Sequence, residues 1–341
     1  MANIAVIGAG SWGTALSIVL ADNGHQVRLW THRKEQADAI NKEHANKKYL
    51  DADIPEQIQA MSDLAEAVKD TEAVVLVVPT KAIREVCGNL ARVIDPNVLL
   101  IHATKGIEPE SLKRVSEMIS EEMPRFAYED IVVLSGPSHA EEVAKRQPTT
   151  VTVSALHLEK AKHAQTLFFN ENFRVYTSND LVGIELGGAL KNIIALGAGI
   201  SDGLGYGDNA KAALITRGLA EITRLGASLG ANPLTFLGLP GVGDLIVTCT
   251  SVHSRNWRAG NLLGQGRPLE GVLEEMGMVV EGVRTAKAAH QLAARQQIEM
   301  PITEGLYQVL FEGKHPADVV EQLMNRTKRD ELDDFQSLLK N

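Results

Sequence analysis

The sequence predicts an α/β, Rossmann-like, doubly wound N-terminal domain followed by an all-α C-terminal domain. Three observations predict this fold: repeated short runs of Val, Ile and Leu, amphipathic stretches between those runs, and a change to long helical patterns near Ser178. The 341 residues exceed one typical domain, and 44% hydrophobic residues supply enough apolar side chains for two cores. We therefore expect one domain over residues 1–178 and a helical domain over residues 179–341.

Seven apolar runs in the first domain have the length and composition of strands. They do not alternate with polar residues, so we expect a sheet that is covered on both faces, as parallel sheets are. A helix is predicted over residues 14–22, ended by Gly24. The predicted strands are residues 4–7, 27–30, 73–78, 98–101, 131–134, 151–153 and 173–176.

The overall composition argues against several classes of protein. A formal net charge of −9 is unfavourable for nonspecific nucleic-acid binding, which needs a basic surface. Cys87 and Cys249 are far apart and form no CxxC pair, so we expect no metal site and no disulfide. The N-terminus does not resemble a signal peptide, and the most apolar stretch, residues 184–200, contains Glu185 and Lys191. We therefore expect a cytoplasmic protein without a membrane span.

A glycine-rich loop follows the first predicted strand directly. Gly8, Gly10 and Gly13 form the pattern GxGxxG at the start of a predicted helix, the context that a dinucleotide site needs. Gly8 permits a tight turn, Gly10 lets the backbone approach a pyrophosphate, and Gly13 lets the helix pack closely on the sheet. The backbone N–H groups of Ser11 and Trp12 lie at the helix N-terminus, where phosphates bind. The alternative is a tight strand–helix turn without a ligand.

The end of the second predicted strand bears on the choice of dinucleotide. NAD-selective sites usually place a carboxylate there to bind the ribose 2′-OH, but residues 30–34 contain none. Arg33, with His32 or Lys34 beside it, is suited to a 2′-phosphate. We therefore expect NADPH to be preferred and NADH to be tolerated. The alternative is that these charges only begin an exposed helix.

Polar residues follow two later strands. In doubly wound sheets the chemistry gathers beyond the carboxyl ends of the strands, which directs Lys105 and the backbone of Gly136 toward the cofactor. His139 follows the same strand as Gly136, and we expect a structural role for it rather than a catalytic one.

A second lysine lies in a glycine-rich helical stretch over residues 185–199. Lys191 has Gly187, Gly188 and Ala195 one turn away, so we expect its ammonium group to be partly desolvated. Desolvation lowers the pKa of a lysine toward the range useful for proton transfer. Glycines inside a helix are unfavourable, and close approach to another backbone or to a ligand usually compensates for them.

Two polar clusters follow in the helical domain. Asp244, in the segment 241–245, is suited to accept a hydroxyl hydrogen bond or to orient Lys191. Ser254, Arg255 and Asn256 lie at a predicted helix start, where a hydroxyl, a guanidinium and an amide beside free N–H groups can bind a phosphate or another oxyanion.

With these residues in place, the chain resembles the soluble, NAD(P)-dependent glycerol-3-phosphate dehydrogenases of bacteria over nearly its whole length. The resemblance rests on several ordered motifs in both domains. They are Gly8–Gly13, Lys105–Gly106, Ser135–Ser138, Gly188–Asn192, Gly243–Leu245, Ser254–Asn256 and Val279–Gly282.

The resemblance implies reduction of dihydroxyacetone phosphate to sn-glycerol 3-phosphate for phospholipid synthesis. It implies that Lys191 is the proton acceptor or donor, and we expect Lys105 to assist it electrostatically. The implied substrate residues are Lys105, Gly136, Ser138, Lys191, Asp244, Ser254, Arg255 and Asn256. The implied cofactor residues, beside the three loop glycines, are Ser11, Trp12, His32, Arg33, Lys105, Ala140, Arg255, Val279 and Glu281. A homodimer is the expected oligomeric state.

Two other functions remain open from the residues alone. One is a related two-domain dehydrogenase that acts on a 3-hydroxy acid or a sugar acid, because the cluster at Arg255 does not distinguish a carboxylate from a phosphate. The other is a noncatalytic NADP-sensing protein, which would not need a desolvated Lys191.

Overall fold

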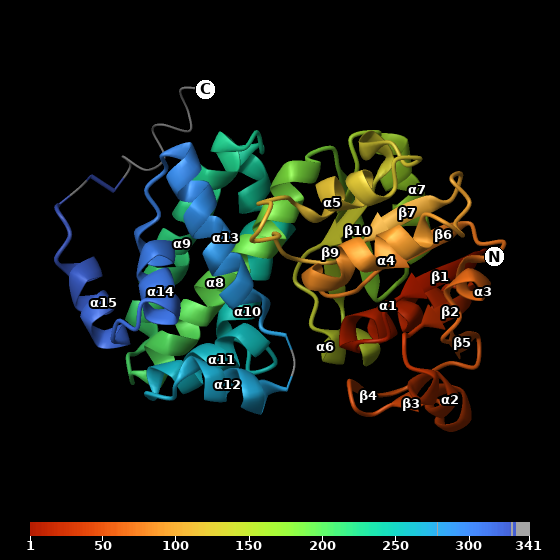
Figure 1. Cartoon of the computed structure of the whole chain (residues 1–341), viewed down its shortest axis with the longest axis horizontal. Coiled ribbons are helices and arrows are strands. Elements are labelled where there is room, and N and C mark those ends of the chain that lie inside the picture. The colour runs from red at the N-terminus through yellow and green to blue at the C-terminus, as the bar shows by residue number, and fades with distance from the viewer. Residues whose placement is uncertain (278, 329, 332–341) are drawn as a thin grey trace. The chain divides into compact units, whose positions relative to one another are not determined.

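The computed structural model describes residues 1–277, 279–328 and 330–331, and Figure 1 shows its helices and strands. The chain forms two compact units, in the predicted order of α/β first and helical second. The α/β unit comprises Met1–Thr104 and Val115–Leu181, and the helical unit comprises the described residues of Lys105–Arg114 and Val182–Asn341. A single boundary at residue 178 would place the segment Lys105–Arg114 in the α/β domain, whereas in the structure it belongs to the helical unit.

The α/β unit is built on an eight-stranded sheet with the order β10-β9-β8-β7-β6-β1-β2-β5. Strands β2 and β5 lie on one side of β1, and β6 to β10 lie on the other, so the order reverses between β1 and β6. Such sheets bind ligands at this point, beyond the carboxyl ends of the strands. The strands are β1 (Asn3–Ile7), β2 (Gln26–Trp30), β5 (Ile58–Met61), β6 (Ala73–Leu76), β7 (Leu99–His102), β8 (Val132–Ser135), β9 (Thr149–Ser154) and β10 (Phe173–Ser178).

One neighbouring pair differs from the expected parallel arrangement. β8 and β9 are antiparallel, with Ser135 opposite Thr152 and Val133 opposite Ser154, while the other pairs of this sheet are parallel. The connection contains only the five-residue helix α6 (Ala140–Ala144), about 7.5 Å long, which does not carry the chain back to the opposite edge of the sheet.

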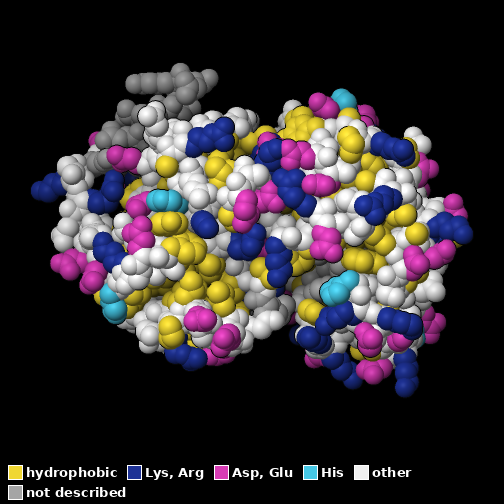
Figure 2. Space-filling view, in the orientation of Figure 1, with side chains coloured by type: hydrophobic (Ala, Val, Ile, Leu, Met, Phe, Trp, Pro, Cys, Tyr) yellow, Lys and Arg dark blue, Asp and Glu magenta, His cyan; other side chains and the backbone are white. Residues whose placement is uncertain are grey.

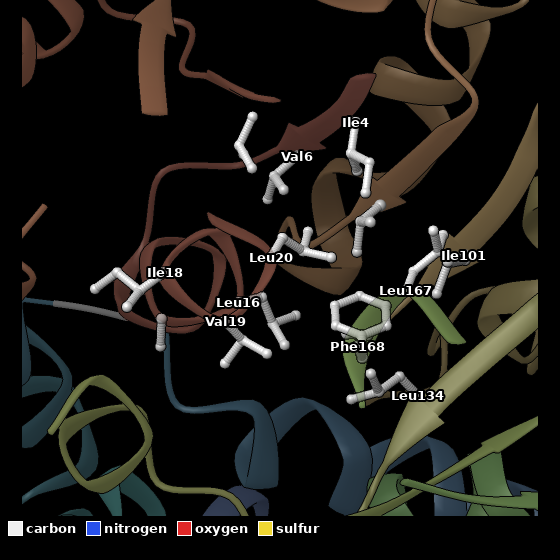
Figure 3. Packing of buried hydrophobic residues seen from close by; sticks show 14 of the residues in the cluster. Ile4, Val6, Leu16, Ile18, Val19, Leu20, Ile101, Leu134, Leu167 and Phe168 are labelled. Carbon is white, nitrogen blue, oxygen red and sulfur yellow. The ribbon is translucent and has the colours of Figure 1, made fainter. Parts of the chain in front are cut away.

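Two hydrophobic cores cover the two faces of this sheet. Ile4 and Val6 point into one core with α1 and α7, and Figure 3 shows them beside Leu16 and Phe168. Ile7, together with side chains of α4 and α5, belongs to the other core. Coverage on both faces explains the lack of polar alternation in the strands. These helices are α1 (Ser11–Asp22), α4 (Ile83–Leu90), α5 (Val115–Glu122) and α7 (Leu158–Phe168).

Sequence analysis missed three short strands between α2 (Lys34–Glu43) and α3 (Leu64–Val68). They are β3 (Ala45–Asn46) and β4 (Leu50–Asp53), which form a small hairpin, and β5, which lies at the edge of the main sheet beside β2. They are two to four residues long and interrupted by polar residues, so no continuous apolar run marks them. The hairpin matters because it contacts the glycine loop.

The helical unit has one core around the buried helix α8 (Leu181–Gly203). Ile107 is buried in this core and forms a bridge with Arg114, whose guanidinium pairs with Glu185 of α8; these contacts hold Lys105–Arg114 in the unit. The other helices are α9 (Asp208–Ser228), α10 (Asp244–Thr250), α11 (Arg255–Gly264), α12 (Leu269–Met276), α13 (Glu281–Gln296), α14 (Pro301–Phe311) and α15 (Pro316–Met324), with the short turns η3 (Pro233–Leu237) and η4 (Leu239–Gly243) between α9 and α10.

Among the described helices, α8 alone is long and apolar enough to cross a membrane by length and composition. However, 94% of its most apolar window is buried among the protein's own residues, as is typical of a core helix. On the face shown in Figure 2, positive and negative side chains are interspersed, so the net negative charge is not gathered in one region of that face.

Candidate active site

Two glycines of the loop between β1 and α1 are required by the packing of the backbone. Gly8 has a φ of +123°, and a Cβ there would lie 2.6 Å from the carbonyl oxygen of Val77. A Cβ on Gly13 would lie 1.8 Å from the carbonyl oxygen of Gly8. Any side chain at either position would displace the backbone, so these glycines build the turn and bring α1 close to it.

Gly10 differs, because a Cβ there would have no atom within 4 Å. Packing therefore does not explain this glycine, whereas a ligand lying against the backbone does. Gly10 also precedes α1 without a side-chain cap, and the first turn of α1, from Ser11, contains no acidic residue. An uncapped helix N-terminus of this kind suits a phosphate, so the residues present fit the pyrophosphate of a dinucleotide.

The end of β2 carries cationic side chains and no carboxylate. The Arg33 guanidinium donates from Nη2 to Gln36 Oε1 at 2.8 Å and to the Tyr49 hydroxyl at 2.6 Å, and it lies over the Tyr49 ring. His32 is exposed, and Lys34 is paired with Asp38 on the surface. Arg33 is thus held by polar contacts, while His32 and Lys34 are not part of that arrangement.

The residues after β8 have an evident structural role. Gly136 has a φ of +142°, and the hydroxyl of Ser138 donates to the carbonyl of Gly136 at 2.9 Å. Ala140 begins α6 and is buried, and the backbone carbonyl of His139 accepts from the first turn of that helix. The structural role expected for the His139 side chain and the ligand roles of Gly136, Ser138 and Ala140 stay predictions.

A cluster of buried charges forms a second candidate site, which lies within the helical unit. Lys191 of α8 donates to Asp244 Oδ1 and, at 2.8 Å, to the hydroxyl of Thr248. Lys105 donates to the other carboxylate oxygen of Asp244 at 2.8 Å. Lys191 and Asp244 are only 6% and 1% exposed. One carboxylate therefore holds two ammonium groups that are far apart in the sequence.

This environment sets the protonation of Lys191. Burial lowers the pKa of its ammonium group to about 8, Asp244 opposes that change, and the positive charge of Lys105 adds to it. Among the described residues, the ammonium has two acceptors for its three hydrogens, which leaves one N–H for a substrate oxygen. A lysine with these properties can donate and regain a proton near neutral pH.

The glycines of α8 bring these groups together. A Cβ on Gly187 would lie 2.5 Å from the carbonyl oxygen of Pro240 in η4, the turn that leads into Asp244. A Cβ on Gly199 would lie 2.0 Å from the carbonyl oxygen of Trp257 in α11. Glycines inside a helix are expected to be compensated by close approach to another backbone or to a ligand. Close approach to another backbone accounts for Gly187 and Gly199. Thr248 was not predicted; its position one turn after Asp244 on α10 is the signal that was available.

The predicted cluster at residues 254–256 does begin a helix. Ser254 caps α11 by accepting from the backbone N–H of Trp257 at 3.2 Å, and Arg255 is exposed at the first position. Asn256 is buried: its amide donates to Asn192 and accepts from the backbone N–H of Gly282. Arg255 is therefore the member placed to reach a solute, whereas Asn256 joins α8, α11 and α13.

Val279 and Glu281 lie at the start of α13. Glu281 is its first residue, Val279 is half-buried, and the neighbouring Gly282 is the residue bound by Asn256. Only the resemblance pointed to these two residues, since no motif of known chemistry marks them.

Known proteins similar to this chain match it over nearly its whole length. Residues 3–161 and 180–321 match the models of the N-terminus and C-terminus of NAD-dependent glycerol-3-phosphate dehydrogenase. A glycerol-3-phosphate dehydrogenase [NAD(P)+] of Oceanobacillus iheyensis is 74% identical over 340 residues, covering 100% of this chain and 98% of that protein. One of Bacillus pumilus is 60% identical, covering 100% and 99%. The crystal structure of glycerol-3-phosphate dehydrogenase from Coxiella burnetii has a TM-score of 0.91 at 38% identity, covering 95% of this chain and 99% of that one. The chain belongs to the NAD-dependent glycerol-3-phosphate dehydrogenase family.

Proposed function

We propose that this protein catalyses the reversible, NAD(P)H-dependent reduction of dihydroxyacetone phosphate to sn-glycerol 3-phosphate. The observation that carries the proposal is the buried ammonium of Lys191, held by Asp244 with one N–H left for a substrate oxygen. Its relatives are named for this activity. In a cell the product would supply phospholipid synthesis.

When bound, the reduced dinucleotide supplies a hydride to the ketone carbon. Lys191, as ammonium, donates its free N–H to the ketone oxygen and transfers a proton as negative charge develops there. Asp244 keeps the ammonium charged and oriented, and Lys105 adds positive charge beside it. The hydride and the proton together convert the ketone to the alcohol, and neutral Lys191 then regains a proton from water. In the oxidation direction, neutral Lys191 accepts the alcohol proton.

The substrate phosphate is assigned to the N-terminus of α11. Arg255 supplies a guanidinium for paired N–H···O bonds, and the helix end adds partial positive charge. Gly136, Ser138, Ser254 and Asn256 complete the proposed substrate residues. Arg255→Ala should raise KM about 10- to 100-fold with a smaller effect on kcat, since a charged hydrogen-bond pair contributes about 1.5–3 kcal/mol. An unchanged KM for dihydroxyacetone phosphate would contradict this assignment.

NADPH is the proposed preferred cofactor, with NADH accepted. Arg33, at the end of a strand that lacks a carboxylate, is suited to the 2′-phosphate. The other proposed cofactor residues are Gly8, Gly10, Gly13, Ser11, Trp12, His32, Lys105, Ala140, Arg255, Val279 and Glu281. A cytoplasmic homodimer completes the proposal, and sedimentation analysis of the purified protein tests the dimer.

The decisive experiment is a spectrophotometric assay of the purified protein. Dihydroxyacetone phosphate should be reduced with both NADPH and NADH, with the higher kcat/KM for NADPH. A 3-keto acid and a keto sugar acid, offered in the same panel, should be poor substrates. Turnover of one of those acids alone would favour a related dehydrogenase. Cofactor binding without turnover of any ketone would favour a noncatalytic sensor.

A further inference from the structure

Gln36, on the first turn of α2, has an amide that bonds the glycine loop and Arg33 at the same time. Its Nε2 donates to the carbonyl oxygen of Ala9 at 2.8 Å, between two glycines of the loop. Its Oε1 accepts from Arg33 Nη2 at 2.8 Å and from the Thr31 hydroxyl at 2.8 Å. The two ends of one side chain thus bind the two segments of the proposed cofactor site.

The chemistry of these partners leaves one orientation for the amide. The carbonyl of Ala9 can only accept and the guanidinium of Arg33 can only donate, so the amide nitrogen must face Ala9 and the amide oxygen must face Arg33. A glutamate would lack the donor, and a methionine would lack both groups. A side-chain amide is therefore needed to donate to Ala9 and accept from Arg33 at the same time.

The β3–β4 hairpin also bonds the same two segments. Asn46 donates to the Ala9 carbonyl at 3.1 Å and to the Thr14 hydroxyl at 2.9 Å, and its Oδ1 accepts from Gln36 Nε2 at 3.2 Å. Its hydrogen bonds do not include Arg33 among the described contacts. Tyr49 accepts from the Ser11 hydroxyl through its carbonyl and from Arg33 through its hydroxyl, each at 2.6 Å. Tyr49 therefore also links the loop to Arg33, but it uses its backbone carbonyl for the loop and its side chain for Arg33. Gln36 makes both bonds with one side-chain amide.

We propose that Gln36 is a positioning residue that sets the discrimination between NADPH and NADH. The pyrophosphate and the 2′-phosphate of NADPH belong to one ligand, so the groups that bind them must keep a matching separation. Gln36 fixes that separation by bonding Arg33 to the loop directly. NADH lacks the 2′-phosphate, so its binding does not depend on where Arg33 lies. The inference rests on the proposed role of Arg33 in binding that phosphate.

The test measures the Kd values of NADPH and NADH for the full-length protein by fluorescence titration, with the unfolding temperature as a check of the fold. Arg33→Ala tests the proposed function and should weaken NADPH binding about 10- to 100-fold, with NADH little changed. Gln36→Met should weaken NADPH relative to NADH about 3- to 10-fold. Asn46→Ala is the matched control, because it removes the other side-chain bond to Ala9 and one weaker bond of Gln36 while leaving Gln36 bonded to both Ala9 and Arg33. It should weaken both cofactors equally.

The possible failures are distinguishable. Loss of discrimination in Arg33→Ala but not in Gln36→Met would overturn the role of Gln36 and keep that of Arg33. Unchanged discrimination in both would overturn the role of Arg33 and, with it, this inference. Equal weakening of both cofactors in Gln36→Met would assign Gln36 to the loop alone and also overturn the inference. If Gln36→Met does not fold, Gln36→Glu keeps the acceptor for Arg33 while adding negative charge. It should lower the NADPH preference further, and an unchanged preference in a folded Gln36→Glu protein would reject the proposal.

Discussion

The two candidate sites, which are parts of different units, are built in opposite ways. In the α/β unit, the glycine loop offers backbone N–H groups and an open position at Gly10, and the residues that form it are consecutive. In the helical unit, Lys191 and Lys105 meet at Asp244 across 53 and 139 positions of sequence, and Lys191 and Asp244 are buried. One part depends on the shape of the backbone and the other on charges removed from water.

This difference teaches what each part can do. Backbone N–H groups do not titrate, so the loop can hold phosphates at any pH at which the protein folds. A buried ammonium changes its charge near neutral pH, because burial lowers the pKa of Lys191 to about 8. Binding is thus assigned to the part that keeps its charge distribution, and proton transfer to the part whose charge changes. Each prediction below tests one side of this division.

The largest effect is expected from Lys191→Met. Methionine has a similar length but no proton to give, so kcat for dihydroxyacetone phosphate should fall by about 10³-fold or more. NADPH binding should stay within about twofold, because the loop is intact. Steady-state kinetics and fluorescence titration measure the two quantities. Lys105→Met, which removes the other partner of Asp244, should cost less activity. A near-normal rate in Lys191→Met would contradict the assignment of proton transfer to Lys191.

A smaller loss is expected from Asp244→Asn, together with a shift in pH dependence. Asp244 raises the pKa of Lys191 against the effect of burial, so without it that pKa falls below about 8. Reduction needs the ammonium form, and its rate in the wild-type protein should therefore decline above about pH 8. In the variant the decline should begin at a lower pH, and the rate at pH 7 should fall about 10²-fold. A pH profile of kcat/KM measures both changes. An unshifted profile would show that Asp244 does not influence the pKa of Lys191.

In the loop, Gly10→Val should affect binding without affecting the fold. The new side chain would meet no protein atom near its Cβ, but it would occupy the space assigned to the pyrophosphate. We expect both dinucleotides to bind about 10- to 100-fold more weakly, with an unfolding temperature close to that of the wild-type protein. Gly13→Ala is the contrasting variant, because its Cβ would lie 1.8 Å from the Gly8 carbonyl and should destabilise the α/β unit. Unchanged cofactor binding in Gly10→Val would argue against the site.

The smallest effect concerns a buried charge of the helical unit that takes no part in the proposed chemistry. Glu221 of α9 accepts from the backbone N–H groups of Ile302 and Thr303 at the start of α14, and burial raises its pKa to about 7. The folded state therefore holds this proton more tightly than the unfolded state, whose carboxyl has an ordinary pKa of 4.5. Stability should decrease as pH rises from about 4.5 to about 7, by roughly 3 kcal/mol.

Glu221→Gln removes the titrating group, so this part of the pH dependence should disappear. Urea unfolding of both proteins at pH 5 and pH 7.5, followed by circular dichroism, measures the difference. The same slope in the variant would show that another group causes it. Activity at fixed pH should change little, which distinguishes a structural buried charge from Lys191.

Local patterns were sufficient for much of the fold. The strands around Val6, Val75 and Val133 follow from continuous apolar runs, and the loop at Gly8–Gly13 follows from glycine spacing before a helix. The hairpin that carries Tyr49 and the reversal of β9 against β8 did not follow from such patterns. Hairpin strands of two and four polar-rich residues have no recognisable period, and strand direction depends on where the connecting segment lies in space.

By itself, the sequence determined that there is a dinucleotide loop, that no carboxylate ends the second strand, and that a lysine lies among small residues in a long apolar helix. These properties depend on neighbours along the chain. Only the tertiary structure decided that Asp244 holds both Lys191 and Lys105, that Lys105–Arg114 packs with the helical unit, and that Gln36 bonds Arg33 to the loop. Such contacts join residues through the packing of whole helices and the register of whole strands, which no short window of sequence contains.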